Sequence, residues 1–169
     1  MLFRSSAQEG TDEDIFQLAR IGDTIAIEHL RSIDPDTVNA VNKYGHTPLI
    51  LASYHDQKET VAYLIRNGAN VNYTFMQGSA IHGAAFKGYT DVARILLSKG
   101  IKVNVPDNNG STPLIYATLF GHNEIAKLLF TEGADVHMKD KSGSSALDYA
   151  RSLENEELLR IFEIKNNKR

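Results

Sequence analysis

Residues 107–137 read DNNGSTPLIYATLFGHNEIAKLLFTEGADVH, and this stretch decides the fold. Asn109-Gly110 predicts a tight turn, because Asn and Gly tolerate the positive φ that such turns require. Thr112-Pro113 predicts the start of a helix, since Thr is a good N-cap and Pro fits the first helical position. The apolar spacing then predicts two short helices, over about 113–120 and 123–130, with a glycine between them.

A helical pair of this size cannot bury its own apolar face, so copies of it must stack on either side. The opening triplet Thr112-Pro113-Leu114 recurs in related form at spacings of 32, 33 and 33 residues, as Thr47-Pro48-Leu49, Ser79-Ala80-Ile81 and Ser145-Ala146-Leu147. The closing segment recurs in step as NGANVN (67–72), KGIKVN (99–104) and EGADVH (132–137). The sequence therefore predicts a repeat protein.

This repeated pattern resembles the ankyrin-repeat family, and the resemblance extends over residues 13–161. It implies an all-α ankyrin-repeat solenoid of stacked helix-turn-helix units with hairpin-like loops. On this basis the chain divides into a flexible N-terminus (1–11), a single repeat domain (12–164) and a basic C-terminal tail (165–169). The domain holds five units, of which the first and last are caps: about 12–41, 42–72, 73–104, 105–137 and 138–164.

Two departures from the repeat carry structural predictions. Asp56 stands where the pattern has Gly between the helices, so it must adopt a conformation that Gly reaches more easily. The third unit is one residue short between Asn72 and Ser79. We therefore expect its hairpin tip to differ in shape from its neighbours.

Composition and charge limit the function classes. The net charge of −3 disfavours a nucleic-acid binder, which would show a basic patch. The absence of Cys excludes disulfides and thiolate metal sites, and no apolar run is long enough to span a membrane. The start, MLFRSSAQEG, is too short and polar for a secretory signal. We expect a cytoplasmic protein, with a periplasmic or secreted form left open if a signal was removed.

No set of residues predicts catalysis. The family resemblance implies that His82 bonds to Ser79 and that His122 follows the inter-helix glycine, both as structural residues. His46 and His55 share a unit, but no third ligand with zinc-like spacing accompanies them. No nucleophile elbow, calcium loop or phosphate-binding glycine cluster is present. We therefore predict that the protein is not an enzyme and uses no metal or cofactor.

The resemblance implies a partner-binding surface made of the hairpin tips and the exposed ends of the first helices. Position by position, that surface comprises Lys43, Tyr44, His46, Tyr54, His55, Phe75, Met76, Phe86, Lys87, Asn108, Asn109, Ser111, Leu119, Phe120 and Lys141. It is rich in aromatic and apolar residues, which mark interaction sites when they are exposed together. The other interpretation is that these side chains pack against each other between repeats.

Two functions share this surface. One is a non-enzymatic interaction module that holds another protein on the concave face, with Tyr54, Phe86 and Phe120 as anchors. The other is an inhibitor or immunity-type protein that blocks an enzyme or toxin. Lys43, Lys87 and Lys141 favour a partner with an acidic rim, and self-association remains open. A small-ligand binder or enzyme built on His46 and His55 is the third alternative.

Overall fold

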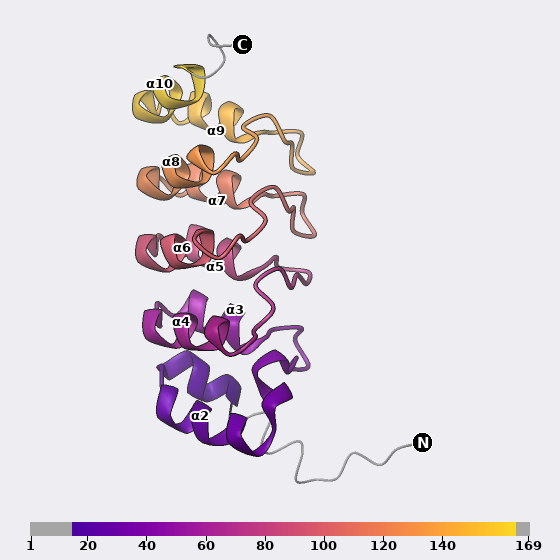
Figure 1. Ribbon diagram of the computed structural model, residues 1–169. Helices are drawn as coiled ribbons and strands as arrows, with labels where there is room; N and C mark the ends of the chain where they lie inside the picture. The colour runs from indigo at the N-terminus through magenta and orange to yellow at the C-terminus, as the bar shows by residue number, and fades with distance from the viewer. Residues whose placement is uncertain (1–14, 165–169) are drawn as a thin grey trace.

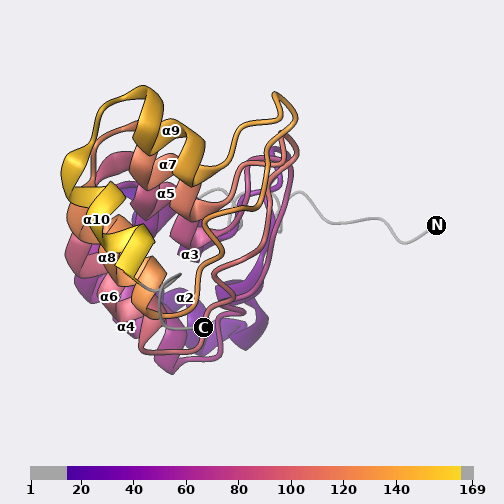
Figure 2. The same ribbon diagram turned by 90° about the horizontal axis from the view of Figure 1, so that it is seen from above.

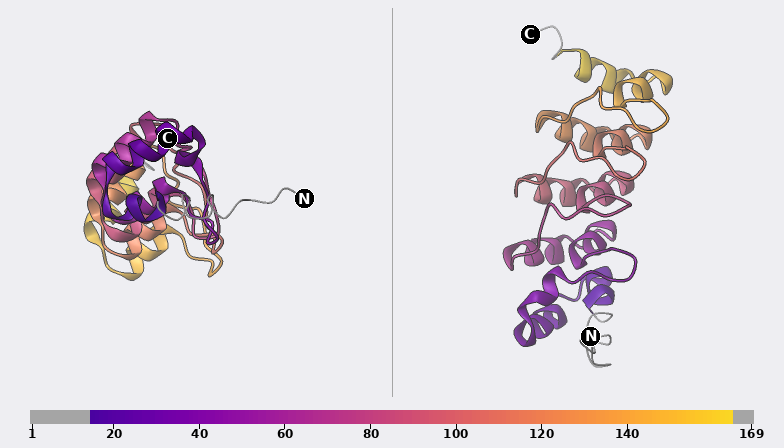
Figure 3. Two further views of the ribbon diagram at one scale, coloured as in Figure 1. Left: turned by 90° about the horizontal axis from the view of Figure 1, so that it is seen from below. Right: turned by 90° about the vertical axis from the view of Figure 1, so that its right-hand side faces the viewer.

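The computed structural model describes residues 15–164 of the chain as a stack of helical pairs along one axis (Figure 1). The predictions for the N-terminus (1–11) and the C-terminal tail (165–169) lie outside the described residues. Each unit adds one layer to the stack and sends its hairpin loop to the same side (Figures 1 and 3). The predicted all-α solenoid is confirmed.

The first unit has a helix over residues 15–21, followed by α2 (Thr24–Ile33) and a 3₁₀ helix, η1 (Pro35–Asn39). The first helices of the next four units are α3 (Pro48–Tyr54), α5 (Ala80–Lys87), α7 (Pro113–Leu119) and α9 (Ala146–Ser152). Their second helices are α4 (Lys58–Arg66), α6 (Thr90–Leu97), α8 (Asn123–Thr131) and α10 (Glu156–Ile164).

The helices pack as two parallel rows. The first helices contact one another in the order α3, α5, α7 and α9, and the second helices in the order α4, α6, α8 and α10. Fully buried side chains recur in the second row at spacings of 32, 33 and 33 residues: Leu64, Leu96, Leu129 and Phe162. Each of these side chains would be exposed in an isolated pair, so burial between units stabilises the stack.

Each first helix begins at a Ser or Thr. Thr112 accepts a hydrogen bond from the Ile115 amide at 3.2 Å, and Thr47 makes the equivalent bond in the second unit. Ser79 and Ser145 instead form capping boxes with the side chain three residues later, which is His82 in one case and Asp148 in the other. These caps satisfy amides that have no partner within the helix.

The residue between the two helices adopts a left-handed conformation in every unit. Gly22, Gly88 and Gly121 have φ of +82°, +81° and +72° at this position. Asp56, at φ +59°, confirms the prediction for the second unit. Glu154, at φ +51°, occupies the same position in the last unit, for which we made no prediction from the sequence.

The hairpin of the third unit differs from the others, as predicted. In the second, fourth and fifth units, the amide of Asn42, Asp107 or Asp140 donates to the carbonyl four residues later, at 2.9–3.0 Å. In the third unit, Phe75 and Gly78 bond to each other instead, at 3.1 and 2.8 Å. The loss of one residue therefore closes this loop into a tighter turn.

Candidate functional site

The first helices and the hairpin tips flank a common face of the stack. Viewed along the stack, the first helices lie in one row and the hairpin tips in a second row beside it (Figure 2). Side chains at the ends of α3, α5 and α7 and in the hairpins meet on this face.

Four aromatic side chains form a continuous row across three units. Tyr54 stacks on Phe86 with ring centres 6.1 Å apart, and Phe86 meets Phe120 edge-on at 4.7 Å. Tyr116 contacts both Phe86 and Phe120, at 5.9 and 6.3 Å. Tyr54 and Phe120 nevertheless remain 36% and 46% exposed. The rings of this aromatic row thus pack against each other between repeats and still present apolar surface to solvent.

Tyr116 belongs to this row, although it was not among the predicted residues. Its hydroxyl donates to Asp107 Oδ2 at 2.8 Å. Burial, together with the hydrogen bond and negative charge of Asp107, raises the pKa of Tyr116 to about 12. The same arrangement joins Tyr149 to Asp140 at 2.7 Å. An Asp at the hairpin with a Tyr nine residues later, present twice, was the sequence signal for this contact.

The hairpin tips are linked to one another. His46 Nε2 donates to Gln77 Oε1 at 2.7 Å, from the second unit to the third. The Asn108 amide donates to the Met76 carbonyl at 2.9 Å, and the Lys141 amide to the Asn109 carbonyl at 2.8 Å. The predicted hairpin residues thus form one connected edge beside the first helices.

Several predicted side chains on this edge are exposed. Tyr44, Phe75 and Met76 are 61%, 42% and 62% exposed. Lys43, His55, Lys87, Asn108, Asn109, Leu119 and Lys141 are exposed as well. These residues are therefore accessible to a partner. Two other predicted residues, His46 and Phe86, are half-buried.

Ser111 is the exception, and its placement on the accessible surface was wrong. Only 9% of its surface is exposed. Its amide donates to Asp107 Oδ1 at 2.9 Å, and its carbonyl accepts a hydrogen bond from His82 Nε2 at 3.3 Å. Ser111 therefore joins two units from the inside, and we leave it out of the candidate face.

His82 and His122, the two histidines expected to be structural, both form hydrogen bonds. His82 bonds to Ser79 within its own unit, and His122 bonds to the preceding unit. The Ser79 hydroxyl lies 3.1 Å from His82 Nδ1, as predicted. Burial lowers the pKa of His82, because it penalises the charged ring. His122 Nε2 donates to the Phe86 carbonyl at 3.1 Å, which ties the fourth unit to the end of α5.

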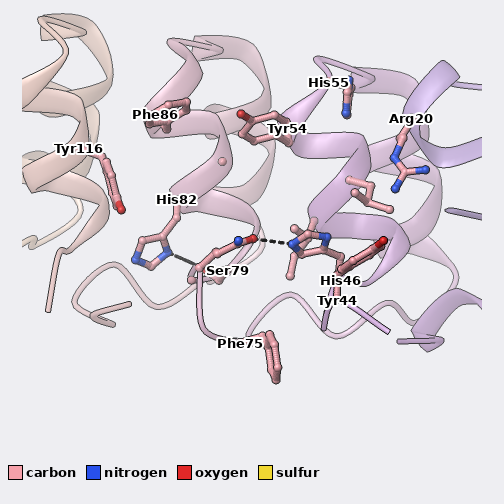
Figure 4. Close-up of a pocket in the computed structure, with 15 residues that line it drawn as sticks. Arg20, Tyr44, His46, Tyr54, His55, Phe75, Ser79, His82, Phe86 and Tyr116 are labelled. Carbon is pink, nitrogen blue, oxygen red and sulfur yellow. Dashed lines mark hydrogen bonds between the residues drawn. The ribbon is translucent and has the colours of Figure 1, made fainter. Parts of the chain in front are cut away.

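A groove of about 500 Å³ opens between the second and third units (Figure 4). Its walls come from α3, α5, α7, the helix over residues 15–21 and two hairpins, and include Tyr44, His46, Tyr54, Phe75, Phe86 and Tyr116. We call it the third-unit groove. Most of its lining is aromatic or aliphatic, which is the usual character of binding sites.

Residues 15–163, whose side chains are described, contain no group of three or more His, Cys, Asp or Glu placed to hold a metal ion. Over the described part of the chain, every helix is too short or too polar to cross a membrane. The exposed residues predicted for the candidate face are mainly aromatic, apolar and basic.

A family model described as "Ankyrin repeats (3 copies)" matches residues 15–107, and one described as "Ankyrin repeats (many copies)" matches residues 96–150. The chain belongs to the ankyrin-repeat proteins. This confirms the resemblance on which the partner-binding surface was predicted. Ankyrin repeats are protein–protein interaction modules.

Similar sequences occur within much larger proteins. The chain is 35% identical over 111 residues to Ankyrin repeat and SAM domain-containing protein 6 of Rattus norvegicus, which is 62% of this chain and 12% of that protein. It is 33% identical over 83 residues to Protein fem-1 homolog A-like of Mus musculus, 48% of this chain and 12% of that protein. It is 32% identical over 120 residues to Alpha-latrotoxin-Lt1a of Latrodectus tredecimguttatus, 69% of this chain and 8% of that protein.

Proposed function

We propose that this ankyrin-repeat chain is a non-enzymatic module that binds a partner protein on the face between its first helices and hairpin tips. The observation that carries the proposal is the aromatic row, whose rings are held by each other and remain accessible. Tyr54 and Phe120 are 36% and 46% exposed although each lies against Phe86. Exposed apolar surface of this kind is typical of interaction sites.

The stack supports tight binding because it holds the row in place before a partner arrives. Phe86 contacts Tyr54 of the second unit and both Tyr116 and Phe120 of the fourth, so the row spans three units. A side chain already fixed in its bound orientation loses little conformational entropy on binding. Large aromatic anchors of this type dominate the energetics of many interfaces.

Substitution of Phe120 tests the proposal. Because Phe120 is nearly half exposed, Phe120→Ala should remove a partner contact with little loss of folding stability. We expect binding to weaken by about 2 kcal/mol, a typical value for an interface anchor. The measurement is co-purification from the native source followed by titration of the recovered partner.

Ile25→Ala provides the matched control. Ile25 is 84% exposed on α2, which belongs to the row of second helices. If Phe120→Ala and Ile25→Ala retain the partner equally, the candidate face is not the binding surface. If Phe120→Ala unfolds the protein, the aromatic row is part of the core.

The alternative of an inhibitor or immunity-type protein uses the same face. A recovered partner that is an enzyme and loses activity on titration with the chain would indicate blocking. A partner whose activity is unchanged while bound would indicate tethering.

A further inference from the structure

The third-unit groove exists because the third unit lacks a side chain that its neighbours have. Gly83 of α5 occupies the position held by Leu51 in the second unit, Tyr116 in the fourth and Tyr149 in the fifth. A Cβ built on Gly83 would lie 3.5 Å from Tyr54, at ordinary contact distance. Because hydrogen stands here in place of a large side chain, the space between Leu51 and Tyr116 is left open.

The short hairpin of the same unit forms another wall of the groove. The Phe75 ring lies directly against Gly45 of the preceding hairpin, where any Cβ would clash with it. Gln77 reaches His46 from the same turn. Figure 4 shows Phe75 and His46 on the hairpin side, with Tyr54 and Phe86 on the helix side. The groove thus combines two departures of one unit from its neighbours.

Two cationic side chains and a histidine border the end of the groove near Tyr54. Arg20 and His55 both line it, and Lys87 Nζ lies 4.6 Å from the centre of the Tyr54 ring. Among the described residues that line the groove, none is Asp or Glu. Within residues 15–163, neither Arg20 nor Lys87 forms an ion pair.

The positive charges of Arg20 and Lys87 disfavour protonation of His55. Burial, and then the positive charges of Arg20 and Lys87, lower the pKa of His55. Like charges that gather beside an apolar groove without a described counter-charge favour an anionic ligand group. A cationic ligand would be repelled from the same place.

We propose that the third-unit groove binds an extended segment of a partner protein, in which a carboxylate side chain stands beside a bulky apolar side chain. The apolar side chain fills the space left by Gly83, and the carboxylate lies among Arg20, His55 and Lys87. This inference rests on the proposed function, because it names the kind of segment that the candidate face recognises. We infer a peptide ligand because the groove continues into the aromatic row: Phe86 lines the groove and also contacts Phe120.

The test begins with random peptides displayed on phage and selected on the full chain. We expect the enriched peptides to carry Asp or Glu within about two residues of a Leu, Ile, Met or aromatic residue, because an extended chain advances about 3.3 Å per residue. Selected peptides are then labelled, and their dissociation constants are measured by fluorescence anisotropy.

Three variants locate the peptide. Gly83→Leu fills the groove and should weaken binding by about tenfold or more, as loss of an anchor contact does. Arg20→Gln and Lys87→Gln should each weaken it by up to about fivefold, with an effect that shrinks at high salt. Lys127→Gln on α8 removes an exposed charge from the other row of helices and should leave binding unchanged.

Folding of each variant is checked by circular dichroism and thermal unfolding. Gly83→Ala serves as a second substitution, since its Cβ has room beside Tyr54 and Ala favours helix over Gly. In nuclear magnetic resonance titrations of the histidine rings, a bound carboxylate should raise the pKa of His55. The chemical shifts of the His29 ring, on α2, should stay unchanged when the peptide binds.

Three results would overturn the inference: no enriched peptides, enriched peptides without an acidic preference, or binding that Gly83→Leu leaves intact. A concentration-dependent dimer that Gly83→Leu abolishes would show that a second copy occupies the groove instead. If peptide selection fails while Phe120→Ala still loses the native partner, only the groove inference falls. If Phe120→Ala retains that partner, the proposed function falls.

Discussion

Asp56 and Glu154 show how a single residue stores strain in this fold. Both have positive φ at a position where three other units have Gly. Asp56→Gly should therefore stabilise the protein by about 0.5–1 kcal/mol, the relief of the left-handed strain less the extra entropy of Gly in the unfolded chain. Urea denaturation measures the change. Gly121→Asp, with φ +72° and open space around its Cβ, is the reverse control and should destabilise by a similar amount. Equal stability of all three proteins would contradict the strain.

The Tyr116–Asp107 pair predicts a pH dependence at alkaline pH. Because the pKa of Tyr116 is raised from 10.0 to about 12, the folded state favours the neutral phenol. Its contribution to stability is complete below pH 10 and is lost as the pH rises toward about 12. Nuclear magnetic resonance of labelled tyrosine rings should show Tyr116 titrating near 12.

Asp107→Asn should move the pKa of Tyr116 back toward 10.0, since it removes the negative charge. The hairpin should survive, because Asn42 makes the same Oδ1 contacts to the amides of Tyr44 and His46 in the second unit. Asp140→Asn changes the equivalent pair in the last unit and should leave Tyr116 unaffected. Titration of Tyr116 near 10 in the unsubstituted protein would refute the interaction.

At the scale of the helix and the hairpin, local signals were sufficient for most predictions. Thr112-Pro113 marks the start of α7, and the second helix predicted from Asn123 begins there. The missing residue before Ser79 yields the tighter Phe75–Gly78 turn. These features depend on caps and turns within a few residues of one another, so the sequence displays them directly.

Contacts between units were harder to predict. The groove joins Gly83 to Tyr54, Phe75 and Tyr116, which lie on different units. A glycine within a short apolar helix carries no local signal, and only the stacking of α3, α5 and α7 shows that its missing side chain opens a space. Ser111 was misplaced for the same reason, because its burial depends on His82 of the preceding unit.

The last unit should be required to cover the apolar flank of the fourth. Helix α10 packs on α8, with Phe162 and Phe130 rings 5.3 Å apart, and α9 packs on α7. A chain that ends at residue 139 should therefore unfold at a lower temperature and aggregate, as measured by calorimetry and light scattering. A chain that ends at residue 164 is the control and should resemble the full chain. Equal stability of both truncated chains would show that the last unit is not a cap.

The whole molecule should behave as a linear array, in which each unit is stabilised by its neighbours. Leu96 of α6 and Leu158 of α10 are both fully buried, one in a central unit and one in the terminal unit. Leu96→Ala and Leu158→Ala remove the same atoms, and each should cost about 2–5 kcal/mol locally. The two variants should differ in how far along the stack that cost is felt.

Native-state hydrogen exchange resolves this difference by unit. Leu158→Ala should speed exchange in α9 and α10 and leave α3 and α4 protected, because only one neighbour depends on the last unit. Leu96→Ala should speed exchange on both sides of α6, since it weakens the interfaces with α4 and with α8. If both variants speed exchange equally throughout residues 15–164, the chain folds as a single cooperative unit. The aromatic row would then owe its order to the whole molecule, and not to the three units that carry it.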